Sequence, residues 1–273
     1  MLTIFERMCL VRYFELGVVD AIHKKEITCP VYLSTGQESV AATLSTLIGG
    51  YLIFTQHRAH DVYLCFGGSP ERLRDELLGL PTGTSGGKAG SNCLQWHENG
   101  VPMFGHHGLS GENVPLGVGA ALGSGKNTVC FFGDGAAEED YVFAAMGFAV
   151  THKLPVLFVC VDNGLCILTP KEVRRSWSIA RVAEALGMRA YDIIDNPFLV
   201  LYCARNLTKD LPALINVSVC RDYWHVGAGI DAPPKWNRYQ VVKDSLGEDA
   251  TRIEDKVRKQ MEGVWDRELL LKQ

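Results

Sequence analysis

The chain has 273 residues, of which 47% are hydrophobic and 21% are charged, and its formal net charge is −4. This composition is typical of a folded globular protein and excludes a disordered or low-complexity chain. The near-neutral charge gives no electrostatic reason to expect nucleic acid or a membrane surface as the main partner. The sequence contains no charge-free apolar run of about 18 residues, the length that a membrane-spanning helix needs.

The nine cysteines are scattered and form no CxxC pair, so the spacing that is typical of zinc sites is absent. Cys130, Cys160 and Cys220 lie inside apolar runs, where a cysteine usually serves as a small buried hydrophobic residue. Residues 1–17 include acidic side chains and lack the uninterrupted apolar stretch of a signal peptide. We therefore expect a reducing, cytoplasmic environment.

The N-terminal part of the chain has a helical pattern. Apolar residues recur at helical spacing over residues 2–23, which predicts an amphipathic helix. A second helix is predicted over residues 35–47, so that residues 1–50 form a helical segment. Residues 67–111 are rich in glycine and small polar residues, and we expect loops there.

The rest of the chain alternates short apolar runs with helical patterns. Strands are predicted over residues 129–132, 154–162, 189–194 and 213–220, and helices over residues 137–152, 178–186, 197–206 and 251–271. Apolar strands separated by helices imply a parallel sheet that is covered on both faces, so we expect a doubly wound α/β fold. Because the chain shows neither a repeat nor a linker, we expect one domain over residues 1–273, ending in a helical tail over residues 237–273.

Three polar side chains follow predicted strands, namely Asp134, Asn163 and His225. In an open parallel sheet, ligands bind beyond the carboxyl ends of the strands. Gly133 and Gly135 flank Asp134, which permits a tight turn and lets backbone N–H groups approach an anion. Since carboxylate and amide oxygens suit Mg²⁺ that also binds phosphate, the sequence predicts a Mg²⁺–diphosphate site. A GDG turn alone is also compatible with an ordinary loop.

The spacing of these residues suggests which cofactor carries the diphosphate. Asp134 and Asn163 are 29 positions apart, and this arrangement resembles the thiamine diphosphate fingerprint. Six motifs follow in order, namely STGQESVAA (34–42), HRAH (57–60), TGTSGGKAGS (82–91), GLSGENVPLGVGAAL (108–122), GDGAAEEDYVFAAMGFA (133–149) and KLPVLFVCVDN (153–163). Over residues 3–225 the chain resembles a short variant of the alpha subunit of two-subunit 2-oxo acid dehydrogenases of the pyruvate, branched-chain and acetoin type. The resemblance implies a thiamine diphosphate-binding fold, with thiamine diphosphate and Mg²⁺ as cofactors.

The resemblance also implies a set of cofactor contacts. Asp134, the Asn163 side chain and the Leu165 backbone carbonyl would bind Mg²⁺. The other implied contacts lie in the GDG turn, the HRAH motif, the loop that holds the aminopyrimidine and the segment after the last strand; they are Gly133, Gly135, Ala136, His57, Arg58, Gly108, Leu109, Ser110 and His225. An arginine is suited to a fork of hydrogen bonds to phosphate oxygens.

Three histidines are the catalytic candidates that the resemblance implies. His225 follows Arg221 by four residues, as in the family, and an imidazole there can assist proton transfer. His60 matches the second basic position of the HRAH motif. His107, together with His106, precedes the aminopyrimidine loop, and these two side chains either face the substrate or cap the loop.

A second chain is implied as well. In this family the glutamate that activates the aminopyrimidine ring belongs to the beta subunit, and the sequence predicts no second sheet domain that would supply it. Glu138 and Glu139 follow the GDG turn and are expected on the diphosphate side. We therefore expect activity only with a beta subunit that supplies the glutamate and the pyrimidine-binding half, in an α2β2 assembly.

The resemblance leaves more than one function open. A 2-oxo acid decarboxylase subunit would pass the acyl unit to the lipoyl group of an acyltransferase. A split transketolase-like or acyloin-forming subunit would pass a ketol or acyl unit, taken from a ketose or 2-oxo acid, to an aldehyde or sugar. A regulatory paralogue would retain only the fold. The chain departs from the family pattern at substrate-side positions, with Tyr32 in place of histidine and Val226 in place of serine, so the donor and acceptor stay open. At the diphosphate side, His57 stands where the family usually has tyrosine.

Overall fold

The computed structural model describes residues 1–98 and 100–266. Its helices are α1 (Leu2–His23), α2 (Glu38–Leu44), α3 (His60–Cys65), α4 (Pro70–Leu77), α5 (Asn113–Ser124), the 3₁₀ helix η1 (Ala136–Glu138), α6 (Asp140–Thr151), α7 (Lys171–Arg174), α8 (Ile179–Ala185), α9 (Pro197–Leu207), α10 (Arg238–Leu246) and α11 (Glu248–Val264). Its strands are β1 (Leu52–Phe54), β2 (Met103–Phe104), β3 (Thr128–Gly133), β4 (Val156–Asp162), β5 (Leu165–Cys166), β6 (Thr169–Pro170), β7 (Arg189–Ile194) and β8 (Ala213–Ser218). In this part of the chain no helix is both long and apolar enough to cross a membrane.

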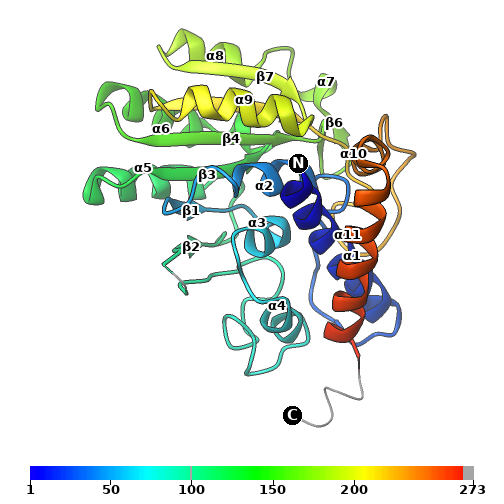
Figure 1. The fold of residues 1–273 in the computed structure, drawn as a ribbon. Helices are drawn as coiled ribbons and strands as arrows, with labels where there is room; N and C mark the ends of the chain where they lie inside the picture. Colours follow the sequence, from blue (N-terminus) through cyan, green and yellow to red (C-terminus); the bar gives the residue numbers. More distant parts are fainter. Residues whose placement is uncertain (99, 267–273) are drawn as a thin grey trace.

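The strands form a six-stranded sheet in the order β2-β1-β3-β4-β8-β7. Every neighbouring pair in this sheet is parallel, so the carboxyl ends of its strands share one edge. The short strands β5 and β6 form a separate antiparallel pair. The parallel sheet with helices on both faces confirms the predicted doubly wound α/β fold (Figure 1).

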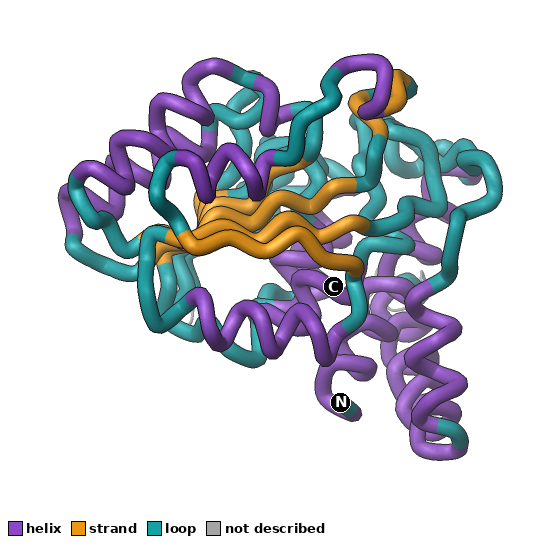
Figure 2. The backbone as a smooth tube through the Cα atoms, turned by 90° about the horizontal axis from the view of Figure 1, so that it is seen from above, coloured by secondary structure: helices purple, strands orange, loops and turns teal. Residues whose placement is uncertain are grey.

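Successive side chains of β3 point to opposite faces of the sheet. Val129 and Phe131 join the core cluster that includes α1, α2, α3, α9 and α11, whereas Cys130 and Phe132 join the cluster with α5, α6 and α8. Figure 2 shows the strands lying between these helical layers. Because both faces are buried, the central strands are apolar throughout, which is why no alternation is visible in their sequence.

Several predicted elements agree closely with the structure. The strand β7 has the predicted bounds, and α9 begins at Pro197 as expected because the Asn196 side chain accepts from the next helical N–H groups. The predicted helix over 137–152 is divided at Glu139, whose extended backbone separates η1 from α6. The last helix ends at Val264, earlier than predicted, and residues 267–273 of the predicted tail lie outside the described part of the chain.

Some elements were not predicted, namely β1, β2, β5, β6, α3, α4, α5 and α7, whereas α10 lies within the predicted helical tail. The prediction of loops over residues 67–111 was wrong at α4, where Ser69 caps the helix and Pro70 occupies its first turn. The strands β1 and β2 have three and two residues, which is too short for a periodic signal. Their carboxyl ends nevertheless bring residues 55–58 and 105–110 to the functional edge of the sheet.

Candidate functional site

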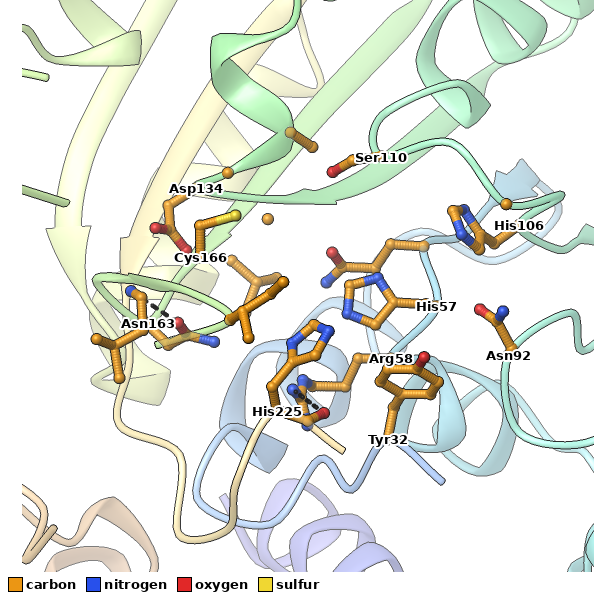
Figure 3. A pocket seen from close by; sticks show the side chains of 18 residues that line it. Tyr32, His57, Arg58, Asn92, His106, Ser110, Asp134, Asn163, Cys166 and His225 are labelled. Atoms are coloured by element: carbon orange, nitrogen blue, oxygen red, sulfur yellow. Dashed lines mark hydrogen bonds between the residues drawn. The ribbon is translucent and has the colours of Figure 1, made fainter. Parts of the chain in front are cut away.

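A cavity of about 250 Å³ lies at the carboxyl ends of the strands (Figure 3). The segments that follow β1, β2, β3, β4 and β8 all contribute to its wall, since these strands are parallel and end at the same edge. The cavity is lined by most of the predicted site residues, namely His57, Arg58, Gly108, Ser110, Gly133, Asp134, Gly135, Ala136, Asn163, Leu165 and His225. Residues separated by more than 160 positions thus meet in one site.

The predicted metal ligands lie together on one side of the cavity. Asp134 is 2% exposed, and its pKa is raised by burial and by the nearby Asp162, although Arg174 acts in the opposite direction. The Asn163 amide donates to Gln37 Oε1 at 3.2 Å, and its oxygen accepts from the Leu165 N–H at 3.1 Å. A carboxylate, an amide oxygen and a main-chain carbonyl are hard oxygen donors, so this set fits Mg²⁺ that also binds phosphate oxygens.

The described residues offer no alternative metal cluster, because no group of three His, Cys, Asp or Glu side chains could hold an ion. The site at Asp134 differs from such clusters, because it offers one carboxylate and two neutral oxygens. A metal ion there would need further oxygen atoms from the bound ligand.

Close packing leaves little room for a side chain at Gly135 and, less strictly, at Gly133. A Cβ atom on Gly135 would lie 2.7 Å from Cys166 Sγ, and one on Gly133 would lie 3.0 Å from Gln56 Oε1. The backbone of Gly135 is right-handed helical, with φ −67° and ψ −42°, so its conformation alone does not require glycine. The GDG turn has little free space, because β5 packs directly on it.

Arg174 is an unpredicted neighbour of the metal ligands. Its guanidinium pairs with Asp134 through Nη2 and with Glu138 through Nη1. On the same helix, α7, Lys171 Nζ lies 2.6 Å from Asp162 Oδ2. The basic run at residues 171–175 is visible in the sequence, but only the fold shows that it faces the acids after β3 and β4.

Arg58 lines the cavity and connects two other segments. It is 6% exposed and donates from Nη1 to the Leu33 carbonyl and from Nη2 to the His225 carbonyl, the latter at 3.2 Å. Burial and the nearby Arg221 lower the pKa of Arg58 to about 10. The guanidinium is thus a buried cation that holds the loop after β8 against the HRAH motif.

Aromatic and imidazole rings form the opposite wall of the cavity. The ring of His57 lies 4.8 Å from that of Tyr32, 5.1 Å from that of His225 and 5.8 Å from that of His106, measured between centroids. Burial lowers the pKa of all three histidines, and Arg58 lowers it further for His57 and His225. The pKa of His225 is lowered to about 4. The three imidazoles are therefore neutral near pH 7. We call Tyr32, His57, His106 and His225 the imidazole wall.

Three predicted site residues do not line the cavity. His60 is fully buried, with Nδ1 3.1 Å from Glu15 Oε1 and Nε2 2.9 Å from Ser91 Oγ. The main-chain N–H of His107 donates to Glu112 Oε1, and the Leu109 side chain is 65% exposed. The structure thus separates the two adjacent histidines, since His106 lines the cavity and His107 does not.

The cavity also contains residues that were not among the predicted site residues, namely Tyr32, Gln56, Asn92, His106, Val161, Cys166 and Ile167. Gln56 follows β1, a strand with no sequence signal, so its position was not predictable. Tyr32 is visible in the sequence as a departure from the family pattern, and His106 as a residue that precedes the aminopyrimidine loop. Their contact with the same histidine is a property of the fold.

Comparisons with known proteins identify the family of the chain. The family model described as "Dehydrogenase E1 component" matches residues 6–206. The pyruvate dehydrogenase E1 component subunit alpha-1 of Arabidopsis thaliana is 33% identical over 169 residues, covering 60% of this chain and 43% of the relative. The alpha subunit of Rickettsia felis is 31% identical over 256 residues, covering 88% of this chain and 76% of the relative. The chain thus spans less than half the length of the plant relative.

Solved structures show the same fold at low sequence identity. A transketolase mutant from Pichia stipitis has a TM-score of 0.64 at 13% identity, covering 96% of this chain and 45% of that chain. Transketolase from Campylobacter jejuni also has a TM-score of 0.64, at 14% identity, covering 97% of this chain and 48% of that chain. On the family match and the Rickettsia relative, the chain belongs to the dehydrogenase E1 component family.

Proposed function

We propose that this chain is the alpha-type subunit of a thiamine diphosphate enzyme that cleaves a 2-oxo acid and transfers the acyl unit to an acceptor such as a lipoyl group. The observation that carries the proposal is the convergence of Asp134, Asn163 and the Leu165 main chain on one cavity. Relatives named as pyruvate dehydrogenase alpha subunits support the same reaction class.

The residues have distinct roles in this proposal. Asp134, Asn163 and the Leu165 carbonyl would hold Mg²⁺, and the N–H groups of Gly135 and Ala136 would bind the diphosphate. The main chain at residues 108–110 would bind the aminopyrimidine. When bound, the cofactor supplies a nucleophilic carbon and an electron sink for the substrate.

His225 and His57 would exchange protons with the substrate side of the site. Both are neutral near pH 7 because of burial and Arg58, so a ring nitrogen of each is free to accept a proton. Arg58 positions His225 through the main-chain contact and would contribute positive charge toward the diphosphate.

We also propose a beta-type partner in an α2β2 assembly. Asp134 is the only carboxylic acid among the described residues that line the cavity, so none of them is a second carboxylate that could activate the aminopyrimidine. Glu138 is held by Arg174 beside Asp134, on the diphosphate side. Leu109, Ile167 and Trp224, which lie in segments that flank the cavity, are each more than half exposed and offer an apolar surface to a partner.

The test is to purify the chain alone and with the chain that is encoded beside it. We expect turnover of 2-oxo acids, followed with an artificial electron acceptor, only by the pair. Turnover by the single chain would contradict the proposed partner. Failure of the pair to bind thiamine diphosphate and Mg²⁺ in calorimetry would contradict the cofactor and the function.

A second candidate reaction is transfer of a ketol or acyl unit to an aldehyde or sugar. The imidazole wall favours it, because neutral imidazoles and a phenol both donate and accept hydrogen bonds and suit a hydroxylated acceptor. The purified pair should be offered lipoyl domains, aldehydes and sugar phosphates with one 2-oxo acid at a time. Products identified by mass spectrometry separate the two reactions, since only the second forms a new carbon–carbon bond.

We further propose that residues 1–273 form a single domain. Support comes from α1 and α11, which pack together within the core cluster that covers one face of the sheet. Limited proteolysis should leave no stable fragment that lacks either helix. A stable fragment without α11 would contradict this proposal.

A cytoplasmic location is also proposed for the chain. It rests on the nine cysteines, all of which are free thiols in the structure. Several relatives are named as mitochondrial proteins, so the matrix of an organelle is the alternative. Fractionation of the source cells, with detection of the chain by an antibody, distinguishes the two.

A further inference from the structure

Tyr32 is the one member of the imidazole wall that is not a histidine, and its ring contacts two of the other three (Figure 3). The centroid of the phenol ring lies 4.8 Å from that of His57 and 5.3 Å from that of His225, at interplanar angles of 72° and 79°. Both contacts are edge-to-face, an arrangement that aromatic rings prefer over a face-to-face sandwich. One phenol ring thus limits the orientation of both imidazoles.

No polar contact orients these two imidazoles. In the part of the chain that the structure describes, His57 and His225 accept or donate no hydrogen bond through a ring nitrogen, and Arg58 binds only the main-chain oxygen of His225. An imidazole that exchanges protons is commonly oriented by a hydrogen bond to its second nitrogen. Here the packing of rings takes the place of such a bond.

The main chain on both sides of Tyr32 is bound to the segments that carry the two histidines. The Val31 carbonyl accepts from the Gly227 N–H at 2.8 Å, in the loop after β8. The Leu33 carbonyl accepts from Arg58 Nη1, in the HRAH motif. The backbone of Tyr32 is therefore fixed relative to both of the rings that it contacts.

A buried polar network holds Tyr32 from the other side. Its N–H donates to Ser91 Oγ at 2.9 Å, and the same oxygen lies 2.9 Å from His60 Nε2. His60 is in turn bound to Glu15 on α1, and both of these side chains are fully buried. Tyr32 thus connects the core of the domain to the wall of the cavity.

Tyr32 and His57 also carry exchanged ring types. The family pattern has histidine at position 32 and tyrosine at position 57, whereas this chain has the reverse. Because the two rings are in contact, the exchange retains one phenol and one imidazole in the same part of the wall. Residues in contact are those whose substitutions are coupled in energy, so the two positions should act as a pair.

We propose that Tyr32 is a positioning residue, whose aromatic ring orients the imidazoles of His57 and His225 and keeps water away from them, and whose hydroxyl is not needed for this task. The inference rests on the proposed function, in which both histidines act on the substrate side, and it adds the residue that orients them. Burial is the main cause that lowers the pKa of each histidine, so removal of the ring should also change their protonation.

The first test is an NMR titration of isotope-labelled histidines in the full chain alone, without cofactor. Tyr32→Ala removes the ring, Tyr32→Phe retains the ring without the hydroxyl, and Tyr202→Ala is the control because Tyr202 lies on α9 and is 66% exposed. Variants that lack one histidine assign the signals. The other titratable or charged groups that face the two imidazoles, namely Arg58, His106 and Arg221, are the same in all three variants.

We expect the pKa of His57 and of His225 to rise in Tyr32→Ala, because water that reaches the rings stabilises the imidazolium form. Both pKa values should stay as in the wild type in Tyr32→Phe and Tyr202→Ala. Tyr32→Leu, which fills part of the space without an aromatic ring, takes the place of Tyr32→Ala if circular dichroism shows that the latter does not fold.

The second test follows turnover of 2-oxo acids by the pair of chains, with an artificial electron acceptor. Tyr32→Ala should lower kcat by roughly 10-fold or more and change KM less, because misplaced groups lose more transition-state stabilisation than substrate binding. Tyr32→Phe should recover most of this loss. A merely structural role of Tyr32 would instead lower the amount of folded enzyme and leave kcat per folded enzyme unchanged.

A double-mutant cycle tests the exchange of rings. Tyr32→His and His57→Tyr are made singly and together, and kcat is measured for each pair of chains. The double variant should retain more activity than the product of the single effects predicts, because it again places one phenol against one imidazole. Effects that simply multiply would overturn the coupling of Tyr32 to His57.

The outcomes separate this inference from the function on which it rests. Absence of turnover in the wild-type pair would contradict the proposed function, while the NMR titrations of the single chain would still test Tyr32. Unchanged pKa values of both histidines in Tyr32→Ala, or equal losses of kcat in Tyr32→Ala and Tyr32→Phe, would overturn the role of the ring.

Discussion

Arg58 donates from Nη2 to the main-chain oxygen of His225 at 3.2 Å, joining residues that are 167 positions apart in the sequence. This contact places a buried guanidinium beside the His225 imidazole. Burial lowers the pKa of His225 to about 4, with Arg58 and then Arg221 as further causes. The contact therefore fixes the position of this loop, and the charge of Arg58 adds to burial in keeping its histidine neutral.

The pH dependence of stability should reveal the neutral state of His225. In the unfolded chain the imidazole takes up a proton near pH 6.5, but in the folded chain only near pH 4. Between these values the unfolded state binds more protons, so His225 lowers stability progressively as the pH falls. A His225→Gln variant lacks this penalty. Its Tm relative to the wild type should therefore rise as the pH is lowered from about 7.5 to about 5.

Other groups do not disturb this comparison. Burial raises the pKa of Glu38 and Asp61 to about 7, which has the opposite effect on the pH dependence, but both proteins contain these residues. His23→Gln, at the exposed end of α1, serves as the control. A difference in Tm between His225→Gln and wild type that is constant over this pH range would show that folding does not lower the pKa of His225.

Replacement of Asp134 should remove the metal site and leave the fold. We expect Asp134→Ala to weaken Mg²⁺ binding by about 3 kcal/mol or more, roughly 100-fold, because a charged ligand has no substitute in the cavity. Asp210→Ala, at an exposed position, is the control. Calorimetry measures the affinity and circular dichroism the fold. Unchanged affinity in Asp134→Ala would argue against the whole cofactor assignment.

His60 should act through the structure rather than on the substrate. It links Glu15 to Ser91, and Glu15 also accepts from the Ser34 N–H at 2.7 Å and the Thr35 hydroxyl at 2.6 Å. His60→Ala removes a hydrogen bond from each of two buried side chains, Glu15 and Ser91, and leaves a cavity between them, so we expect a loss of about 2–4 kcal/mol in unfolding free energy. Denaturant titration measures this loss.

The control for His60 is His152→Ala at the exposed end of α6. It should change stability by less than about 0.5 kcal/mol. If His60→Ala instead unfolded like the wild type and lost only turnover, a direct catalytic role for His60 would be supported.

The narrow GDG turn makes Gly135 sensitive to a single methyl group. A Cβ atom there would lie 2.7 Å from Cys166 Sγ, so Gly135→Ala should lower stability by about 1–3 kcal/mol. Cys166→Ala removes the sulfur, and the double variant should recover part of this loss. Gly263→Ala, which meets nothing within 4 Å, is the control and should be neutral or slightly stabilising. Equal costs of Gly135→Ala with and without Cys166 would assign the strain to another contact.

Much of the sheet was predictable because its signals are local. The strands β3, β4 and β8 are continuous or nearly continuous apolar runs, β7 is a more polar strand between two helical patterns, and Asp134 and Asn163 come directly after β3 and β4. The parallel arrangement then places these residues at one edge without further information. By contrast, β1 and β2 are too short to produce a pattern, so the positions of Gln56 and His106 were not predictable.

The role of His60 could not be deduced from its motif either. The HRAH sequence presents His57, Arg58 and His60 alike, yet the first two line the cavity and the third is buried beneath it against Glu15. The start of α3 at His60 determines this difference, because a helical turn directs neighbouring side chains to different sides.

The amino-acid sequence by itself determined the family and the parallel sheet, and it predicts the oxygen donors of the proposed metal site, because each of these depends on short motifs or on the order of apolar runs. Only the tertiary structure decided that Tyr32 and His57 share a wall with His225, and that Arg174 binds the carboxylate of Asp134. These contacts join residues from 25 to almost 200 positions apart. No local sequence pattern encodes contacts between residues so far apart in the chain, since these contacts form only when the loops converge after the strands have paired.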